Sequence, residues 1–210
     1  GTDEDSLAVP GERLVVAKSL AEAVKKETRI TDWRLVAELT GLEGTVCRHP
    51  LHGRGYDFDV PALAAGFVDV DAGTGVVHIA PGHGADDWEL GIKHGLAAPE
   101  TMDADGVFSE AVPLFAGKRV LTSYGKPGDA NGAVVDALKE AGALLASGRL
   151  VHSYPHSWRS KAPLIFRNTP QWFISMEKTG LRATALNAIA ETRFIPESGR
   201  ARLHGMIETR

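Results

Sequence analysis

The stretch from Asp71 to Gly95 constrains the fold of this chain more than any other segment. It reads DAGTGVVHIAPGHGADDWELGIKHG, so a glycine-rich turn and a short apolar run precede a Pro-Gly-His-Gly loop and a helix-like pattern. This order predicts a strand over residues 76–80, a loop, and a helix that begins near Asp86 and ends at Gly95. The first N–H groups of a helix have no partner inside the helix, so such a loop can present backbone donors to a ligand. We therefore expect the active site in this stretch.

The composition is that of an ordinary globular protein, with 43% hydrophobic and 24% charged residues among 210. The net charge of -4 argues against binding nucleic acid through a broad basic surface, although it leaves a local basic groove open. The single cysteine, Cys47, excludes an internal disulfide framework and fits a reducing cytoplasm. No apolar run approaches the roughly 20 residues that span a bilayer, so we expect no membrane partner.

Local patterns elsewhere predict a mixed α and β chain. Short strands are expected at residues 13–17, 45–48, 66–70, 144–145 and 150–151, a hairpin at 52–58, and helices at 19–27, 131–140, 181–191 and 198–207. The composition turns toward Trp, Pro and Arg near Tyr154, which we interpret as a domain boundary. Since the chain stops at Arg210 without a closing signal, we expect it to be a piece of a longer protein.

Asp86 and Asp87 open the predicted helix. One of them is expected to be the N-cap and the other a first-turn acid that the helix dipole favours. Because adjacent residues at a helix start point in different directions, one carboxylate is free to grip an ammonium group, act as a general base or bind a metal.

The two histidines of the stretch have different settings. His78 lies in an apolar run, where a hydrogen-bonded core histidine and a site residue are equally compatible with the pattern. His83 stands between Gly82 and Gly84 in a loop, where a polar contact or simple exposure is expected. The glycines permit close approach of the backbone to a ligand, but a tight turn would need them equally.

The sequence lacks two common phosphate-binding motifs, but its histidines and aspartates allow a metal site as an alternative. Gly73-Thr74-Gly75 lacks the third glycine of the dinucleotide fingerprint, and no Gly-Lys-Ser/Thr signature occurs. A metal-dependent small-molecule hydrolase is an alternative, with these ligands: His78, His83, Asp86 and Asp87. Ser157 and Ser160 have the spacing of a zinc knuckle, but serine is a poor zinc ligand, so we expect no structural zinc there.

Two long motifs carry a family resemblance. Residues 73–91, GTGVVHIAPGHGADDWELG, closely resemble the editing-domain signature of class I isoleucyl-tRNA synthetases. Residues 152–173, HSYPHSWRSKAPLIFRNTPQWF, resemble the segment that leads the same enzymes back to their catalytic core. The resemblance extends from about Val9 to Arg210. Valyl and leucyl relatives share the Gly-Thr-Gly and the later aspartate but usually differ at His78 and at Pro-Gly-His-Gly, so the isoleucyl enzymes match better.

The resemblance implies a proofreading activity. Its substrate would be valine wrongly attached to the isoleucine tRNA, with valyl-adenylate as a second candidate. Asp87 matches the family aspartate that holds the substrate α-ammonium and is the expected catalytic residue, and His78 matches a position that lines the amino-acid pocket and helps to exclude isoleucine. The remaining expected substrate-binding residues surround these two: Thr74, Gly75, Gly82, His83, Gly84 and Asp86.

The resemblance also implies an architecture and partners. We expect an α+β fold in which residues 1–153 form a β-barrel-like editing domain with peripheral helices, and residues 154–210 connect back toward a catalytic core outside this sequence. The expected partners are the single-stranded tRNA 3′ end, its valine moiety and the rest of the synthetase. A non-catalytic module that holds the tRNA end is a third interpretation.

No cofactor is expected within this sequence. The His-Ile-Gly-His and Lys-Met-Ser-Lys-Ser nucleotide signatures are absent, so ATP and Mg²⁺ would belong to the parent catalytic core. The family site also uses a threonine-rich strand with a Thr-Thr-x-Pro-Trp-Thr pattern, which would precede this sequence. We therefore expect the isolated chain to be weak or inactive as a deacylase.

Overall fold

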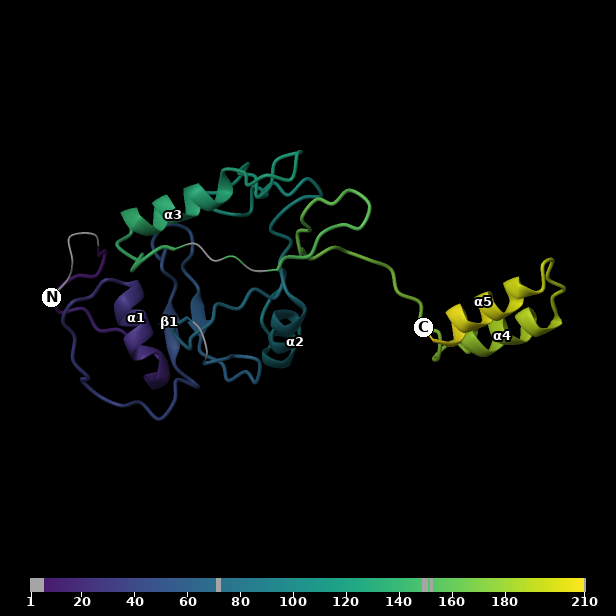
Figure 1. Ribbon diagram of the computed structural model, residues 1–210, viewed down its shortest axis with the longest axis horizontal. Coiled ribbons are helices and arrows are strands. Elements are labelled where there is room, and N and C mark those ends of the chain that lie inside the picture. The colour runs from purple at the N-terminus through teal and green to yellow at the C-terminus, as the bar shows by residue number, and fades with distance from the viewer. Residues whose placement is uncertain (1–5, 71–72, 149–150, 152, 210) are drawn as a thin grey trace. The chain divides into compact units, whose positions relative to one another are not determined.

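The computed structural model describes residues 6–70, 73–148, 151 and 153–209 (Figure 1). The chain divides into two compact units, Gly1–Asn168 and Thr169–Arg210, and each is described by itself. The predicted boundary near Tyr154, between an editing domain and a connecting segment, stays a prediction. Helices and a small sheet occur together, which agrees with the expected α+β class. No helix within the described ranges is long and apolar enough to cross a membrane.

The first unit holds three α-helices among its described residues. A 3-10 turn, Lys18–Leu20 (η1), leads into α1 (Ala21–Glu27), and α2 (Ala85–His94) and α3 (Ala130–Glu140) follow. All three lie within a few residues of their predicted positions. Gly95 ends α2 in the left-handed conformation with φ 69°, and Gly142 follows α3 with φ 64°, as the glycine signals predict.

The sheet of the first unit is a two-stranded antiparallel hairpin. Strand β1 (Val46–Arg48) pairs with β2 (Asp59–Pro61), with Cys47 opposite Val60. Between them the His49 ring stacks on Tyr56, with centroids 4.7 Å apart and an interplanar angle of 12°. The predicted hairpin is confirmed. The barrel-like core stays a prediction, since the described residues show only this two-stranded sheet.

Several predicted strands are wrong. Residues 13–17, 66–70, 76–80 and 144–145 are not strands in the structure, whereas Leu150 lies outside the described residues. A strand needs a continuous ladder of backbone hydrogen bonds with a neighbour, which a short apolar run does not supply by itself. Among the described residues, segment 13–17 has one such bond, from the Ala17 N–H to the Thr74 carbonyl at 2.7 Å.

The segment between α2 and α3 is a chain of tight turns closed by isolated bridges, which pair Met102 with Phe108 and Val107 with Arg119. Asp129 anchors its end, because its Oδ1 accepts the Arg119 N–H at 2.8 Å and its Oδ2 pairs with Lys118 Nζ at 3.1 Å. These two interactions lower the pKa of Asp129, with the hydrogen bond from the Arg119 backbone as the main cause and the Lys118 side chain as the second. The turns bring Thr101 and Pro99 to His83 and Gly82, in the loop that precedes α2.

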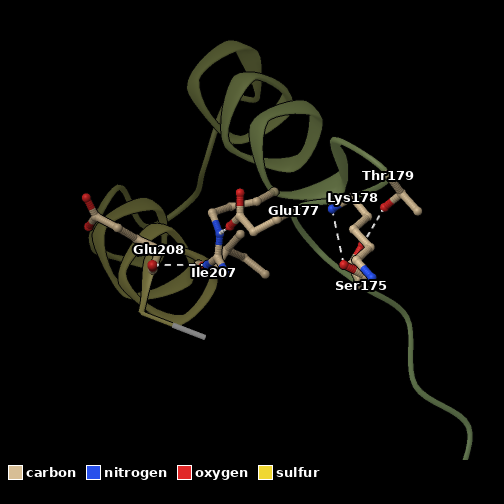
Figure 2. Close-up of polar contacts among 7 residues, drawn as sticks. Ser175, Glu177, Lys178, Thr179, Ile207 and Glu208 are labelled. Atoms are coloured by element: carbon tan, nitrogen blue, oxygen red, sulfur yellow. Dashed lines mark hydrogen bonds and ion pairs between the residues drawn. The ribbon is translucent and has the colours of Figure 1, made fainter.

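The second unit is a pair of packed helices, α4 (Leu181–Glu191) and α5 (Ser198–Glu208). Both agree with the sequence prediction to within one residue. Arg182 joins their ends, because its guanidinium donates to the carbonyl oxygens of Ile207 and Glu208 and pairs with the Glu177 carboxylate (Figure 2). The last carbonyls of a helix have no partner within it, so this arginine caps α5 from α4.

Candidate active site

The Pro-Gly-His-Gly loop delivers the chain directly into α2. Gly84 is the N-cap, with extended backbone at φ -155°, and the Trp88 N–H bonds its carbonyl at 2.9 Å. Asp86 and Asp87 both lie in the first helical turn, and neither side chain caps the helix. The prediction that one of them is the N-cap is therefore wrong: the glycine takes that position, and both acids interact with the helix dipole as first-turn residues.

The two acids nevertheless differ in their contacts. Asp87 is half-buried, and its Oδ2 accepts the Ala80 N–H at 2.9 Å, whereas Asp86 is exposed. The bond ties the first turn of α2 back to the end of segment 76–80. Within the described residues no hydrogen bond reaches the other oxygen of Asp87, Oδ1, so this atom can accept a hydrogen bond from a ligand.

His83 joins three parts of the first unit. Its Nδ1 lies 2.8 Å from the Phe166 carbonyl oxygen and its Nε2 lies 2.7 Å from Thr101 Oγ1. Because a carbonyl only accepts, Nδ1 must carry the hydrogen, and in the neutral ring Nε2 then accepts from the threonine hydroxyl. Both nitrogens of His83 are therefore occupied, which makes this residue a brace for the loop.

A cleft of about 200 Å³ opens beside this loop. One wall is the loop and the start of α2, and the other is the segment Phe166–Asn168, which Asn168 fastens through Nδ2 to the Ala98 carbonyl at 2.5 Å. Trp88 lines it with 47% of its surface exposed. Arg167 also lines it and has no hydrogen-bond or ion-pair partner among the described residues. The cleft therefore offers an aromatic face and a free cation.

Gly82 permits the tight packing of this loop. It is buried, and a Cβ there would lie 3.1 Å from the Pro99 carbonyl oxygen. At Gly84 a Cβ would meet Asp87 Cγ at 3.4 Å, an ordinary contact. The close approach at Gly82 is thus to the chain itself.

Five predicted site residues are not among those that line the cleft: Thr74, Gly75, His78, Asp86 and Asp87. Thr74 and Gly75 form a turn against Ala17, where a Cβ on Gly75 would lie 2.5 Å from the alanine Cβ. His78 is exposed, so the alternative of a core histidine does not apply, and its role in the pocket stays a prediction. It acts on His49, the pKa of which is lowered first by burial and second by the charge of His78.

The alternative metal site has no support from this geometry. In the part of the chain that the structure describes, no three His, Cys, Asp or Glu side chains gather as a group that could hold a metal ion. The structure therefore does not assemble the four proposed ligands into such a group: His78, His83, Asp86 and Asp87.

The sequence prediction missed three cleft residues inside the central stretch, Pro81, Ala85 and Trp88, and four cleft or brace residues outside it: Thr101, Phe166, Arg167 and Asn168. Thr101 follows the central stretch closely, whereas residues 166–168 lie far along the chain and reach it only through tertiary packing. The Arg167-Asn168 pair does lie inside the second family-like motif, so that motif could have indicated that its middle returns to the site.

Comparison with known proteins identifies the class. The family model for class I tRNA synthetases (I, L, M and V) matches residues 13–210, so the chain belongs to this family. Among curated proteins it is similar to an isoleucine–tRNA ligase of Caulobacter vibrioides, with 51% identity over 100% of this chain and 23% of that protein. A ligase of the same name from Pelagibacter ubique is 48% identical over 94% of this chain and 21% of its own length. The chain thus spans less than a quarter of these relatives, and its resemblance to the isoleucyl enzymes is confirmed.

Proposed function

We propose that this chain is the proofreading part of an isoleucine–tRNA ligase and hydrolyses valine from mischarged isoleucine tRNA, with valyl-adenylate as a further substrate. The observation that carries the proposal is the placement of Asp87, which is held on the first turn of α2 by Ala80 with Oδ1 unpartnered among the described residues. It lies within the motif that resembles the family's editing signature. Its charge suits an α-ammonium group.

A separate hydrolytic site is needed because one binding pocket discriminates poorly between similar amino acids. Valine and isoleucine differ by one methylene, which a pocket discriminates by only about 1–3 kcal/mol. A synthetic site therefore admits some valine, and a second site that excludes the larger side chain removes the error. We assign the exclusion to His78, so His78→Ala should allow hydrolysis of correctly charged Ile-tRNA.

The proposed chemistry is attack of water on the ester that joins valine to the tRNA. Asp87 fixes the amino acid through its ammonium group, and backbone groups of residues 82–84 with neighbouring polar side chains position the water. The water oxygen bonds to the carbonyl carbon, the ester C–O bond breaks, and the 3′-terminal oxygen of the tRNA leaves with a proton. Asp87 orients the substrate and is not the base, since the ammonium occupies its carboxylate.

The cleft suits the end of the RNA. Single-stranded nucleic acid is held by aromatic faces on which bases stack and by cations that contact phosphates. Trp88 and Arg167 supply one of each on the same cleft. We further propose that residues 1–153 form part of a barrel-like domain in the whole ligase. Aminoacylation, with ATP and Mg²⁺, would take place in a separate catalytic core of that ligase.

Deacylation of Val-tRNA tests this function. The rate is measured with this chain and with a full-length isoleucine–tRNA ligase that carries the same segment, each with and without Asp87→Asn. We expect release of valine that Asp87→Asn slows strongly, with the larger rate in the full-length enzyme. Loss of the wild-type rate on adding a chelator would favour a metal-dependent hydrolase instead. Tight tRNA binding with no hydrolysis in either protein would favour a non-catalytic module.

A further inference from the structure

The segment Pro155–Leu164, called here the return loop, folds back on itself as a tight hairpin. Its ends are joined by the Leu164 N–H to the Pro155 carbonyl at 3.1 Å and by a bridge between His156 and Pro163. At the tip the Ser157 N–H bonds the Ala162 carbonyl at 2.9 Å. The tip is therefore closed by the backbone.

The two serines of the return loop stabilise its tip further. Ser157 Oγ accepts the Ser160 N–H and Ser160 Oγ accepts the Ala162 N–H, each at 3.3 Å. The Lys161 N–H bonds the Ser157 carbonyl at 2.9 Å, and Lys161 itself takes a left-handed conformation with φ 58°. The hydroxyls thus satisfy the backbone donors of the turn, so the tip is ordered before any ligand arrives.

This ordered tip presents a tryptophan and an arginine to solvent. Trp158 is 76% exposed, and the Arg159 guanidinium lies 4.8 Å from the centre of its ring. Because this indole is exposed, it does not contribute to the hydrophobic core of the unit. Stacking of the guanidinium on the ring orients the cation while leaving its outer N–H groups available.

The sequence on either side of the tip carries basic residues and no acidic ones. Between Glu140 and Glu177 the sequence contains no Asp or Glu. Arg159 and Lys161 have no ion-pair or hydrogen-bond partner for their side chains within the ranges that the structure describes. Two free cations beside an exposed indole suit a ligand that combines flat aromatic rings with negative charge, as single-stranded nucleic acid does.

We propose that the tip of the return loop is a second RNA contact, where an unpaired base stacks on Trp158 while Arg159 and Lys161 contact the adjacent phosphates. The inference rests on the proposed function, which supplies the tRNA as the partner. The contact is separate from the cleft, since the return-loop tip contributes none of the cleft's lining residues. It explains how a chain of net charge -4 holds RNA locally.

Equilibrium binding of an uncharged isoleucine tRNA transcript tests the contact. The wild-type chain is compared with Trp158→Ala, Trp158→Phe and Arg159→Gln at several salt concentrations, and Arg34→Gln, an exposed arginine elsewhere in the first unit, is the matched charge control. Stacking on one base predicts a Kd about 5- to 150-fold higher for Trp158→Ala. Trp158→Phe should recover part of the affinity. Arg159→Gln should lower the slope of log Kd against log salt by about 0.7–0.9.

The outcomes separate this contact from the proposed function. Equal affinities of all variants, or an equal loss in Arg34→Gln, overturn the contact, and deacylation that persists in the same proteins leaves the proposed function standing. Absence of tRNA binding in the wild-type chain overturns the contact, and absence of deacylation in the full-length ligase overturns the proposed function. Pelleting with phosphatidylserine vesicles that depends on Trp158, with no effect on tRNA binding, identifies a membrane contact and also overturns the inference. Circular dichroism spectra verify that each variant is folded.

Discussion

The Oδ2 atom of Asp87 accepts the backbone N–H of Ala80 at 2.9 Å, so the proposed ammonium anchor is itself held by the segment before the loop. This relationship allows charge and position to be tested separately. Asparagine can still accept the Ala80 N–H but carries no charge. For Asp87→Asn we expect deacylation of Val-tRNA to fall about 10- to 150-fold, the value of a hydrogen bond to a charged group, with little change in melting temperature.

Asp87→Ala removes the charge and the hydrogen bond together. It should lose as much activity and, in addition, about 1 kcal/mol of stability, because the Ala80 N–H loses its partner. Asp86→Asn is the matched control, since the Asp86 carboxylate adjoins Asp87 in the sequence but is exposed. Equal activity in Asp87→Asn and wild type would remove Asp87 from the proposed mechanism.

His83 is predicted to stabilise the fold and to take no direct part in hydrolysis. Its ring bonds both the Phe166 carbonyl and Thr101 Oγ1, and His83→Leu leaves these groups to find new partners. We expect a loss of about 1–3 kcal/mol in the free energy of unfolding, measured by urea denaturation. Thr101→Val breaks only the Nε2 bond and should cost less. A His83→Leu protein as stable as wild type would show that the brace contributes nothing.

The helices could be predicted because their signals are local. Apolar spacing and the stop glycines Gly95 and Gly142 act within a few residues of the element that they end. The strands could not be predicted in the same way, because strand pairing depends on residues that are distant in the sequence. The run 76–80 has a strand-like sequence, but its Ala80 N–H bonds a side chain, Asp87, and no partner strand adjoins it among the described residues.

The candidate site likewise contains residues that the sequence predicts and residues that it does not. The loop and the first turn of α2 follow from one continuous stretch, so Asp87 and His83 could be named in advance. Arg167 could not, since it reaches the cleft only through the bonds that His83 and Asn168 make to distant backbone. The clearance that requires a glycine at 82 is likewise set by Pro99, on another segment.

Arg182 is predicted to hold the helix pair of the second unit together. Its guanidinium meets the Ile207 and Glu208 carbonyls and the Glu177 carboxylate (Figure 2), and its side chain is only 22% exposed. Arg182→Met keeps the length of the side chain and removes the donors. We expect faster amide hydrogen exchange in α4 and α5, with unit 1 as the internal reference. The control is Arg202→Met, an exposed arginine on α5, and equal exchange in both variants would contradict the role of Arg182.

Arg167 is predicted to contribute to RNA affinity through the cleft. It has no partner among the described residues and shares the cleft with Trp88. For Arg167→Gln we expect weaker tRNA binding and a smaller salt slope, by about 0.7–0.9, because one phosphate contact is lost. Arg34→Gln again provides the control. Combination with Arg159→Gln should lower the slope further if the two contacts are independent, and no additional change would indicate that they act on one phosphate.

His49 links the pH dependence of stability to the proposed pocket residue His78. Burial, and secondarily the charge of His78, lower the pKa of His49 below 6.5. Its Nδ1 also accepts the Leu51 N–H at 3.0 Å, which requires the unprotonated nitrogen. Since the folded pKa is lower than the unfolded one, the unfolded state binds more protons between the two values. The contribution of His49 to stability is therefore complete above pH 6.5 and is lost as the pH falls through the folded pKa.

Two substitutions test this linkage. His49→Phe retains an aromatic ring against Tyr56 but cannot titrate, so its free energy of unfolding should change less than that of wild type between about pH 7 and pH 5. His78→Ala removes the neighbouring charge, so the pKa of His49, followed by NMR titration of its ring protons, should rise toward 6.5 without reaching it, because burial remains the larger cause. An unchanged pKa of His49 in His78→Ala would show that the two rings do not interact in solution, and a complete return to 6.5 would show that burial contributes nothing.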